Sequence, residues 1–169
     1  MKDRLYYPRR GEGGFIITSA LVLIVIVSLV ALTWYQEKQK DGYDAEVKRL
    51  CAIDGGVMVY ETVELPPEKF SEFGTVKIPS KEYAKPLDEF FYEGSDMYIL
   101  RGNPTIRRSS AKYIRRSDGK VLGESVSYHR RGGDPLVVQL LSPPSSFSCP
   151  KLSELHFKIQ SIFVKETDQ

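Results

Sequence analysis

The side chains that most often carry catalysis are few in this chain and lie far apart in the sequence. His129 and His156 are the only histidines, and no Cys-x-x-Cys or His-x3-His pair supplies ligands at the spacing of a zinc site. The stretch 109–112 reads Ser-Ser-Ala-Lys and matches the Ser-x-x-Lys nucleophile motif. Penicillin-binding enzymes place that motif at the start of a helix in a much larger domain, whereas here it lies in a strand-like segment. We therefore expect no catalytic residue, no metal and no cofactor.

The two cysteines are the next candidates for chemistry. Cys51 and Cys149 both follow the apolar N-terminal segment of the chain. In a domain outside the cytoplasm they are expected to form a disulfide. Such a bond would close a loop of roughly 100 residues, worth about 4 to 5 kcal/mol in the chain-entropy model. In a cytoplasmic domain they would instead be two buried thiols.

Charge is segregated along the chain, although the net charge of +2 is too small to indicate a nucleic-acid partner. Residues 101–131 contain nine basic side chains against Asp118 and Glu124, while residues 61–96 contain nine acids and four lysines. The basic segment predicts a face for an anionic partner such as lipid headgroups or an acidic protein. Its members would be Arg107, Arg108, Lys112, Arg115, Arg116, Lys120, Arg130 and Arg131. The alternative is that acidic and basic segments neighbour each other in the fold and cancel.

An apolar segment near the N-terminus predicts how the domain is held. From Phe15 to Trp34 there are 20 residues without a charge, and a helix of that length covers about 30 Å, the thickness of the hydrocarbon core of a bilayer. A lone strand would leave its backbone groups unsatisfied in lipid. Trp34 and Tyr35 fit the aromatic belt at a membrane surface. We therefore expect residues 15–35 to form a transmembrane helix embedded in the lipid bilayer.

A cleaved signal peptide is the alternative for this segment. Its apolar region would be shorter, about 7 to 15 residues, and would end in a small-x-small cleavage site. Here Leu29-Val30-Ala31 has a large residue at the −3 position. The sequence therefore favours an uncleaved anchor over a signal peptide.

The charge that flanks the segment predicts its orientation. Four Lys or Arg residues precede it, and fewer follow it directly, so the N-terminus is expected in the cytoplasm. The chain then divides into a basic cytoplasmic tail (1–14), the transmembrane helix (15–35), a juxtamembrane segment with a short amphipathic helix (36–50) and an extracytoplasmic domain (51–169). The protein would be a single-pass protein of a cell inner membrane with a periplasmic domain.

The domain itself reads as α+β: a short helix and an antiparallel β-sheet after the transmembrane helix. Asp41-Gly42 predicts a break before the short helix at 43–50. Strands are expected at 57–63, 97–101 and 136–141, with helical turns at 68–73 and 86–92. Asp118-Gly119 between two β-prone arms, 106–116 and 120–130, predicts a hairpin. Residues 155–160 alternate like a strand, but Leu155, Ile159 and Ile162 also fit a helix.

The N-terminal layout resembles that of type IV pilin-like proteins. The matching features are Arg9-Arg10, Gly14-Phe15, the long apolar segment and the two cysteines. The resemblance implies cleavage after Gly14, a long helix that continues into an amphipathic segment, and a β-sheet head closed by a disulfide. It covers mainly residues 9–50. Members usually carry Glu five residues after the cleavage point, where this chain has Ser19, and the predicted break at Asp41-Gly42 also departs from one continuous helix.

Taken together, these patterns predict a membrane-anchored envelope protein without catalytic activity. Its domain would serve as an interaction or assembly module outside the cytoplasm, with a protein partner in the membrane or envelope. The two alternatives are a pilin-like structural subunit and an envelope enzyme whose site the sequence does not reveal.

Overall fold

The computed structural model describes residues 12–72, 74 and 76–166. It contains one long apolar N-terminal helix followed by an antiparallel β-sheet with short helices, which confirms the predicted α+β class. The helices are α1 (Glu12–Asp54), the 3-10 turn η1 (Pro67–Lys69), α2 (Leu136–Leu141) and α3 (Leu152–Ile159). The strands are β1 (Gly56–Val59), β2 (Val63–Leu65), β3 (Phe90–Leu100), β4 (Thr105–Arg115), β5 (Val121–Arg131), β6 (Ser146–Cys149) and β7 (Phe163–Lys165).

The first helix, α1, runs for 43 residues without interruption. The predicted break at Asp41-Gly42 is therefore wrong. A helical glycine costs about 1 kcal/mol relative to alanine, and the packing of the following two turns offsets this cost. Val47 is fully buried and Cys51 is 7% exposed, both in contact with the sheet. Tertiary packing, rather than local propensity, thus extends the helix to Asp54.

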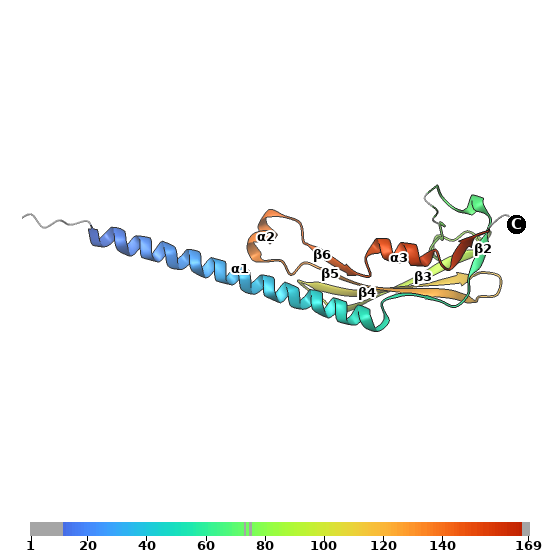
Figure 1. The fold of residues 1–169 in the computed structure, drawn as a ribbon, viewed down its shortest axis with the longest axis horizontal. Coiled ribbons are helices and arrows are strands. Elements are labelled where there is room, and N and C mark those ends of the chain that lie inside the picture. Colours follow the sequence, from blue (N-terminus) through green and yellow to red (C-terminus); the bar gives the residue numbers. More distant parts are fainter. Residues whose placement is uncertain (1–11, 73, 75, 167–169) are drawn as a thin grey trace, which may run out of the picture.

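Five strands form the main sheet, in the order β1-β5-β4-β3, with β6 also paired to β5. All of these pairings are antiparallel. β1 pairs with residues 123–126 of β5 and β6 with residues 128–131, so these two short strands lie end to end along the same edge of β5. β2 and β7 form a separate parallel pair. In Figure 1 the C-terminal half of α1 lies along one side of the sheet, while its N-terminal half extends away from the domain.

The centre of the sheet is the predicted hairpin. β4 and β5 pair from Thr105↔Arg131 to Ile114↔Val121, close to the predicted arms. Gly119 in the turn has a φ of +70°, the left-handed conformation that glycine adopts without strain. The hairpin is therefore confirmed, and its register decides which side chains face α1.

Two clusters of buried side chains hold the layers together. The first lies between α1 and the sheet and contains Val47, Cys51, Ile106, Val126 and Tyr128. The second lies on the other side and contains Leu65, Tyr113, Leu122, Ile162 and Phe163. The rings of Phe163 and Phe90 pack edge to face, with their centroids 5.2 Å apart. The sheet is thus covered on one face by α1 and, over part of the other, by the C-terminal segment.

Several predicted elements differ from the structure. The strand expected at 136–141 is wrong: the segment forms α2, directly after Pro135, and it pairs with no strand. Residues 152–159 form α3, so the helical alternative there is the right one. The helical turn expected at 86–92 is wrong over its second half, because β3 begins at Phe90 and pairs with β4 along its length. The strand expected at 57–63 is divided between β1 and β2.

Candidate functional site

The exposed half of α1 is the largest unusual surface of the molecule. Every side chain from Thr18 to Leu32 is exposed, and most are large and apolar. Leu23 is 62% exposed and Val27 is 66% exposed, values that apolar residues rarely reach together on a protein in water. The helix is long and apolar enough to cross a membrane. Residues 1–11 of the predicted basic tail lie outside the described residues.

Two hydroxyl side chains in this half of α1 are bonded to the backbone of the helix itself. The hydroxyl of Ser28 donates a hydrogen bond to the carbonyl oxygen of Ile24 at 2.8 Å. The hydroxyl of Thr33 donates to the carbonyl oxygen of Val30, also at 2.8 Å. A helix that returns its own hydroxyl groups to its backbone exposes fewer unpaired donors, as an apolar surrounding requires.

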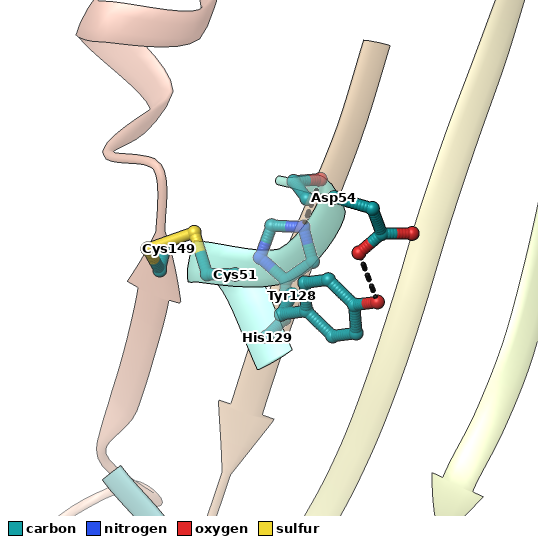
Figure 2. The surroundings of a disulfide bond; sticks show 6 residues. Cys51, Asp54, Tyr128, His129 and Cys149 are labelled. Atoms are coloured by element: carbon teal, nitrogen blue, oxygen red, sulfur yellow. Dashed lines mark hydrogen bonds between the residues drawn. A yellow bond between two sulfur atoms is a disulfide. The ribbon is translucent and has the colours of Figure 1, made fainter. Parts of the chain in front are cut away.

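The opposite end of α1 is fixed to the sheet. The structure brings Cys51 in the last turns of α1 and Cys149 at the end of β6 to disulfide distance, with the two Sγ atoms 2.06 Å apart (Figure 2). The pairing of a helix end with an edge strand 98 residues later agrees with the predicted pair. It holds α1 against β5 and β6, the two strands that it contacts most.

A polar cluster lies beside the cysteine pair, at the C-terminal end of α1. The hydroxyl of Tyr128 donates to Asp54 Oδ1 at 2.6 Å, and Arg108 donates to Asp54 Oδ2 at 2.8 Å (Figure 2 shows the Tyr128 bond). The hydrogen bond from Tyr128 holds the pKa of the Asp54 carboxyl below its usual value, although burial opposes it, and Arg108 adds to the lowering. Burial raises the pKa of Tyr128. The cluster therefore joins α1, β4 and β5 through one ionised carboxylate.

A second ion pair joins α1 to β5 in a buried position. Arg130 is 2% exposed, and its guanidinium donates to both carboxylate oxygens of Asp44. The same guanidinium donates to the carbonyl oxygen of Gly132 and to the hydroxyl of Ser145. Removing water from a charge costs several kcal/mol, and these four contacts offset that cost. Arg130 is thus a structural residue at the contact between helix and sheet.

The eight basic residues predicted to face an anionic partner are distributed over both sides of the sheet. Arg108 reaches α1 through Asp54, whereas its neighbour Arg107 points to the other face and pairs with Asp96 at 3.2 Å. Five of the eight form ion pairs: Arg107 with Asp96, Arg108 with Asp54, Arg115 with Glu61 and Asp118, Lys120 with Glu61, and Arg130 with Asp44. Most of this charge is therefore neutralised by acidic partners within the fold.

Three basic residues form no ion pair with the residues that the structure describes. Arg116 donates to the carbonyl oxygens of Asp88 and Lys85. Its guanidinium carbon also lies 5.1 Å from the centroid of the Phe91 ring. Lys112 and Arg131 are exposed on β4 and at the end of β5. The binding face stays a prediction, and these three residues carry the charge that remains for it.

A shallow groove on the sheet face opposite α1 brings Ser109 together with two serines that the sequence did not single out, Ser125 and Ser127. Its floor includes Ser109, Ser125 and Ser127, and Ser109 donates to Asp96 at 2.6 Å. On the neighbouring strand β5, Ser127 Oγ lies 2.9 Å from His129 Nε2. Burial lowers the pKa of His129, and the charge of Arg107 lowers it further. Ser127 and His129 are two residues apart in a predicted strand, so their side chains lie on the same face, and this spacing could have indicated the pair.

This pair is a poor nucleophile site because Ser127, although it lines the groove, is only 5% exposed and offers little surface to a substrate. The Ser-x-x-Lys match lies in β4, where Ser109 and Lys112, three residues apart, point to opposite faces. Among the described residues there is no group of three or more His, Cys, Asp or Glu side chains that could hold a metal ion.

No known protein family matches this sequence, and no curated protein or solved structure is significantly similar to it.

Proposed function

We propose that this protein is a membrane-anchored assembly subunit of the pilin-like kind, with no catalytic role. In this proposal the apolar half of α1 holds the subunit in the inner membrane. It then packs against the same helix of other subunits during assembly. The domain after α1 lies outside the cytoplasm and presents the surface of the assembled structure. The predicted protein partner is accordingly another copy of the chain or a related subunit.

The continuity of α1 carries the proposal. One helix provides both an exposed apolar half and, after Gly42, a half that packs on an antiparallel sheet. A protein that only needed an anchor would gain nothing from a rigid connection between span and domain, because a flexible linker would serve equally well. The cysteine pair strengthens the connection at the end of the helix. The resemblance to pilin-like proteins implies this same division of one helix into two halves.

One departure limits how far the resemblance extends. Position 19 is serine rather than the usual glutamate. The polymerising role therefore rests on the shape and apolar surface of α1 and not on a carboxylate at that position.

The N-terminus of the mature protein tests the proposal. We expect intact-mass measurement on protein from membranes to show loss of residues 1–14, with Phe15 as the new N-terminus, and electron microscopy of gently released material to show filaments. The matched control is Gly14→Leu, which should keep residues 1–14 and yield no filaments. A full-length mass together with single, dispersed chains would refute the proposal and favour a lone anchored interaction module.

A further inference from the structure

Helix α2 has an apolar surface with the reverse of the usual arrangement. Its five apolar side chains, which are Leu136, Val137, Val138, Leu140 and Leu141, are between 41% and 83% exposed. Its one polar side chain, Gln139, is turned toward the protein: Nε2 donates to the carbonyl oxygen of Asp134, and Oε1 accepts from Asn103. Single exposed apolar residues are ordinary, but a contiguous exposed apolar group whose one polar member is bonded to the protein marks a binding surface.

A polar framework holds α2 in place. We call residues 134–145 the α2 lobe. Asp134 is 5% exposed at its base and accepts hydrogen bonds from the backbone N–H of Ser145 at 2.7 Å and from the Ser145 hydroxyl. Asn103 accepts from the backbone N–H of Gly133 at 2.6 Å. The two ends of the lobe are therefore bonded to each other, its base is bonded to the loop between β3 and β4, and Arg130 of β5 donates to the Ser145 hydroxyl. The apolar side chains are presented by a built element rather than by a loose loop.

The lobe lies at the level of α1 where the apolar segment ends. The backbone N–H of Leu136 donates to Gln36 Oε1 at 3.1 Å. Gln36 follows Trp34 by two residues, about 3 Å along a helix axis. Figure 1 shows α2 beside the middle of α1, at the end of the domain from which the apolar half emerges. If Trp34 lies at the membrane surface, α2 lies there too.

We propose that the α2 lobe is a second membrane contact, which inserts its apolar side chains into the boundary between headgroups and acyl chains beside α1. The inference rests on the anchoring role of α1 in the proposed function, but not on filament assembly. The bilayer fits better than a second copy of the chain because α2 contacts α1 at Gln36, two residues beyond Trp34, where the apolar segment ends. Residues 135–144 also contain no charge, and Lys38, whose ammonium lies 6.0 Å from the Trp34 ring, places a cation at the same level.

Two membrane contacts would fix the domain more tightly than one. A single helix lets the domain rotate about the membrane normal and tilt. The α2 lobe restricts the tilt by holding one side of the domain to the surface, so the sheet would stand in a defined orientation before any assembly step.

Tryptophan quenching by brominated lipids tests the inference on the full chain, one copy per nanodisc. The chain has a single tryptophan, Trp34, which reports the anchor in the unaltered protein. In a Trp34→Phe background, Leu140→Trp reports the lobe. Leu87→Trp is the matched control, because Leu87 is 94% exposed and precedes β3 at the end of the sheet far from α2. We expect lipids brominated near the headgroup to quench Trp34 and the Leu140→Trp variant about twofold or more, and to leave the Leu87→Trp variant unchanged.

The outcomes separate the two proposals. If Trp34 is quenched while the Leu140→Trp variant behaves like the Leu87→Trp variant, the lobe does not contact the membrane and the inference is overturned. If emission of the Leu140→Trp variant changes only in discs that hold several copies, the lobe contacts a second copy and the inference is likewise wrong. If Trp34 itself escapes quenching, the anchor fails, and the proposed function fails with it.

Discussion

Loss of the cysteine pair is expected to destabilise the domain strongly, because it removes the covalent link between α1 and β6. The pair joins the end of α1 to β6, beside the buried cluster around Val47 and the ion pairs that Asp44 and Asp54 form with the sheet. Replacing Cys51 and Cys149 with alanine removes the covalent link and adds no hydroxyl group to a buried site. The perturbation therefore tests the link itself.

The expected magnitude follows from the sequence separation of 98 residues. In the chain-entropy model, a bond that closes a loop of this length restricts the unfolded chain by about 4.7 kcal/mol at 25 °C. For a domain of this size, that loss lowers the midpoint of thermal unfolding by on the order of 20 °C. A domain with the usual margin of about 5 to 15 kcal/mol would lose a large part of it.

The assay is urea unfolding of the full chain in detergent, followed by near-ultraviolet circular dichroism of the aromatic core. The two single alanine variants and the double variant complete a cycle. Because either substitution breaks the same bond, we expect each single variant to lose as much free energy of unfolding as the double variant. Wild-type protein treated with a reducing agent should behave like the variants.

Three results would refute this reasoning. A loss below about 1 kcal/mol in the double variant would mean that the pair does not restrict the unfolded chain. Losses in the two single variants that add to give the loss in the double variant would mean that each side chain acts through its own packing and not through a bond. If the wild-type protein ran at the same position with and without reducing agent, as the Cys51→Ser control should, the bond would not form in the cell.

Three further substitutions test individual contacts of the fold, each by the urea midpoint of the full chain. Arg130→Met should cost about 3 kcal/mol, because it leaves the carboxylate of Asp44 without its buried partner, whereas Lys112→Met on the exposed side of β4 should change stability by less than about 0.5 kcal/mol. Asp54→Asn should cost most above about pH 4 and progressively less below it. The lowered pKa of Asp54 makes its carboxylate stabilising above the unfolded-state pKa, and this contribution disappears as the pH falls through the folded-state pKa. A difference from wild type that is constant with pH would contradict this assignment. Gly123→Ala should cost about 1 to 3 kcal/mol, since the added Cβ would lie 2.6 Å from Cδ1 of Ile162; an unchanged midpoint would mean that the strand shifts without cost.

The features that the sequence predicted best are those with local signals. The hairpin follows from Asp118-Gly119, because a turn that favours a left-handed glycine lies between two β-prone arms. The apolar segment follows from an uncharged run of 20 residues, and the helix there is confirmed while its insertion in a membrane stays a prediction. These signals need no knowledge of distant residues.

The features that the sequence missed depend on contacts between distant residues. Gly42 continues a helix because Val47 and Cys51, further along, are buried against β4 and β5. Residues 136–141 are apolar and look like a buried strand, yet they lie on the surface in α2, where the framework around Asp134 holds them. Periodicity does not reveal whether an apolar run is buried in the protein or exposed for a partner.

The candidate site was predicted only in part, again because some of its contacts join distant residues. The cysteine pair was expected because the chain has two cysteines and its domain is predicted to lie outside the cytoplasm. The distribution of basic residues over two faces required the register of β4 and β5, which a hairpin signal alone does not give. Apart from Asp118 in the hairpin turn, the acids that neutralise them lie in α1, β3 and the segment after β1, up to 86 residues away.

The covalent link from helix to sheet also determines how the domain would respond to pulling. Tension along α1 would enter the domain through the turns around Val47 and be passed at Cys51 directly to β6. With the pair oxidised, residues 51–149 form a closed ring, so force applied at the membrane end cannot peel the helix from the sheet beyond the link or draw out the strands inside the ring. Only the parts of the chain outside the ring, before Cys51 and after Cys149, would extend under load. A subunit built in this way would behave as a nearly inextensible connector between the membrane and whatever its domain holds.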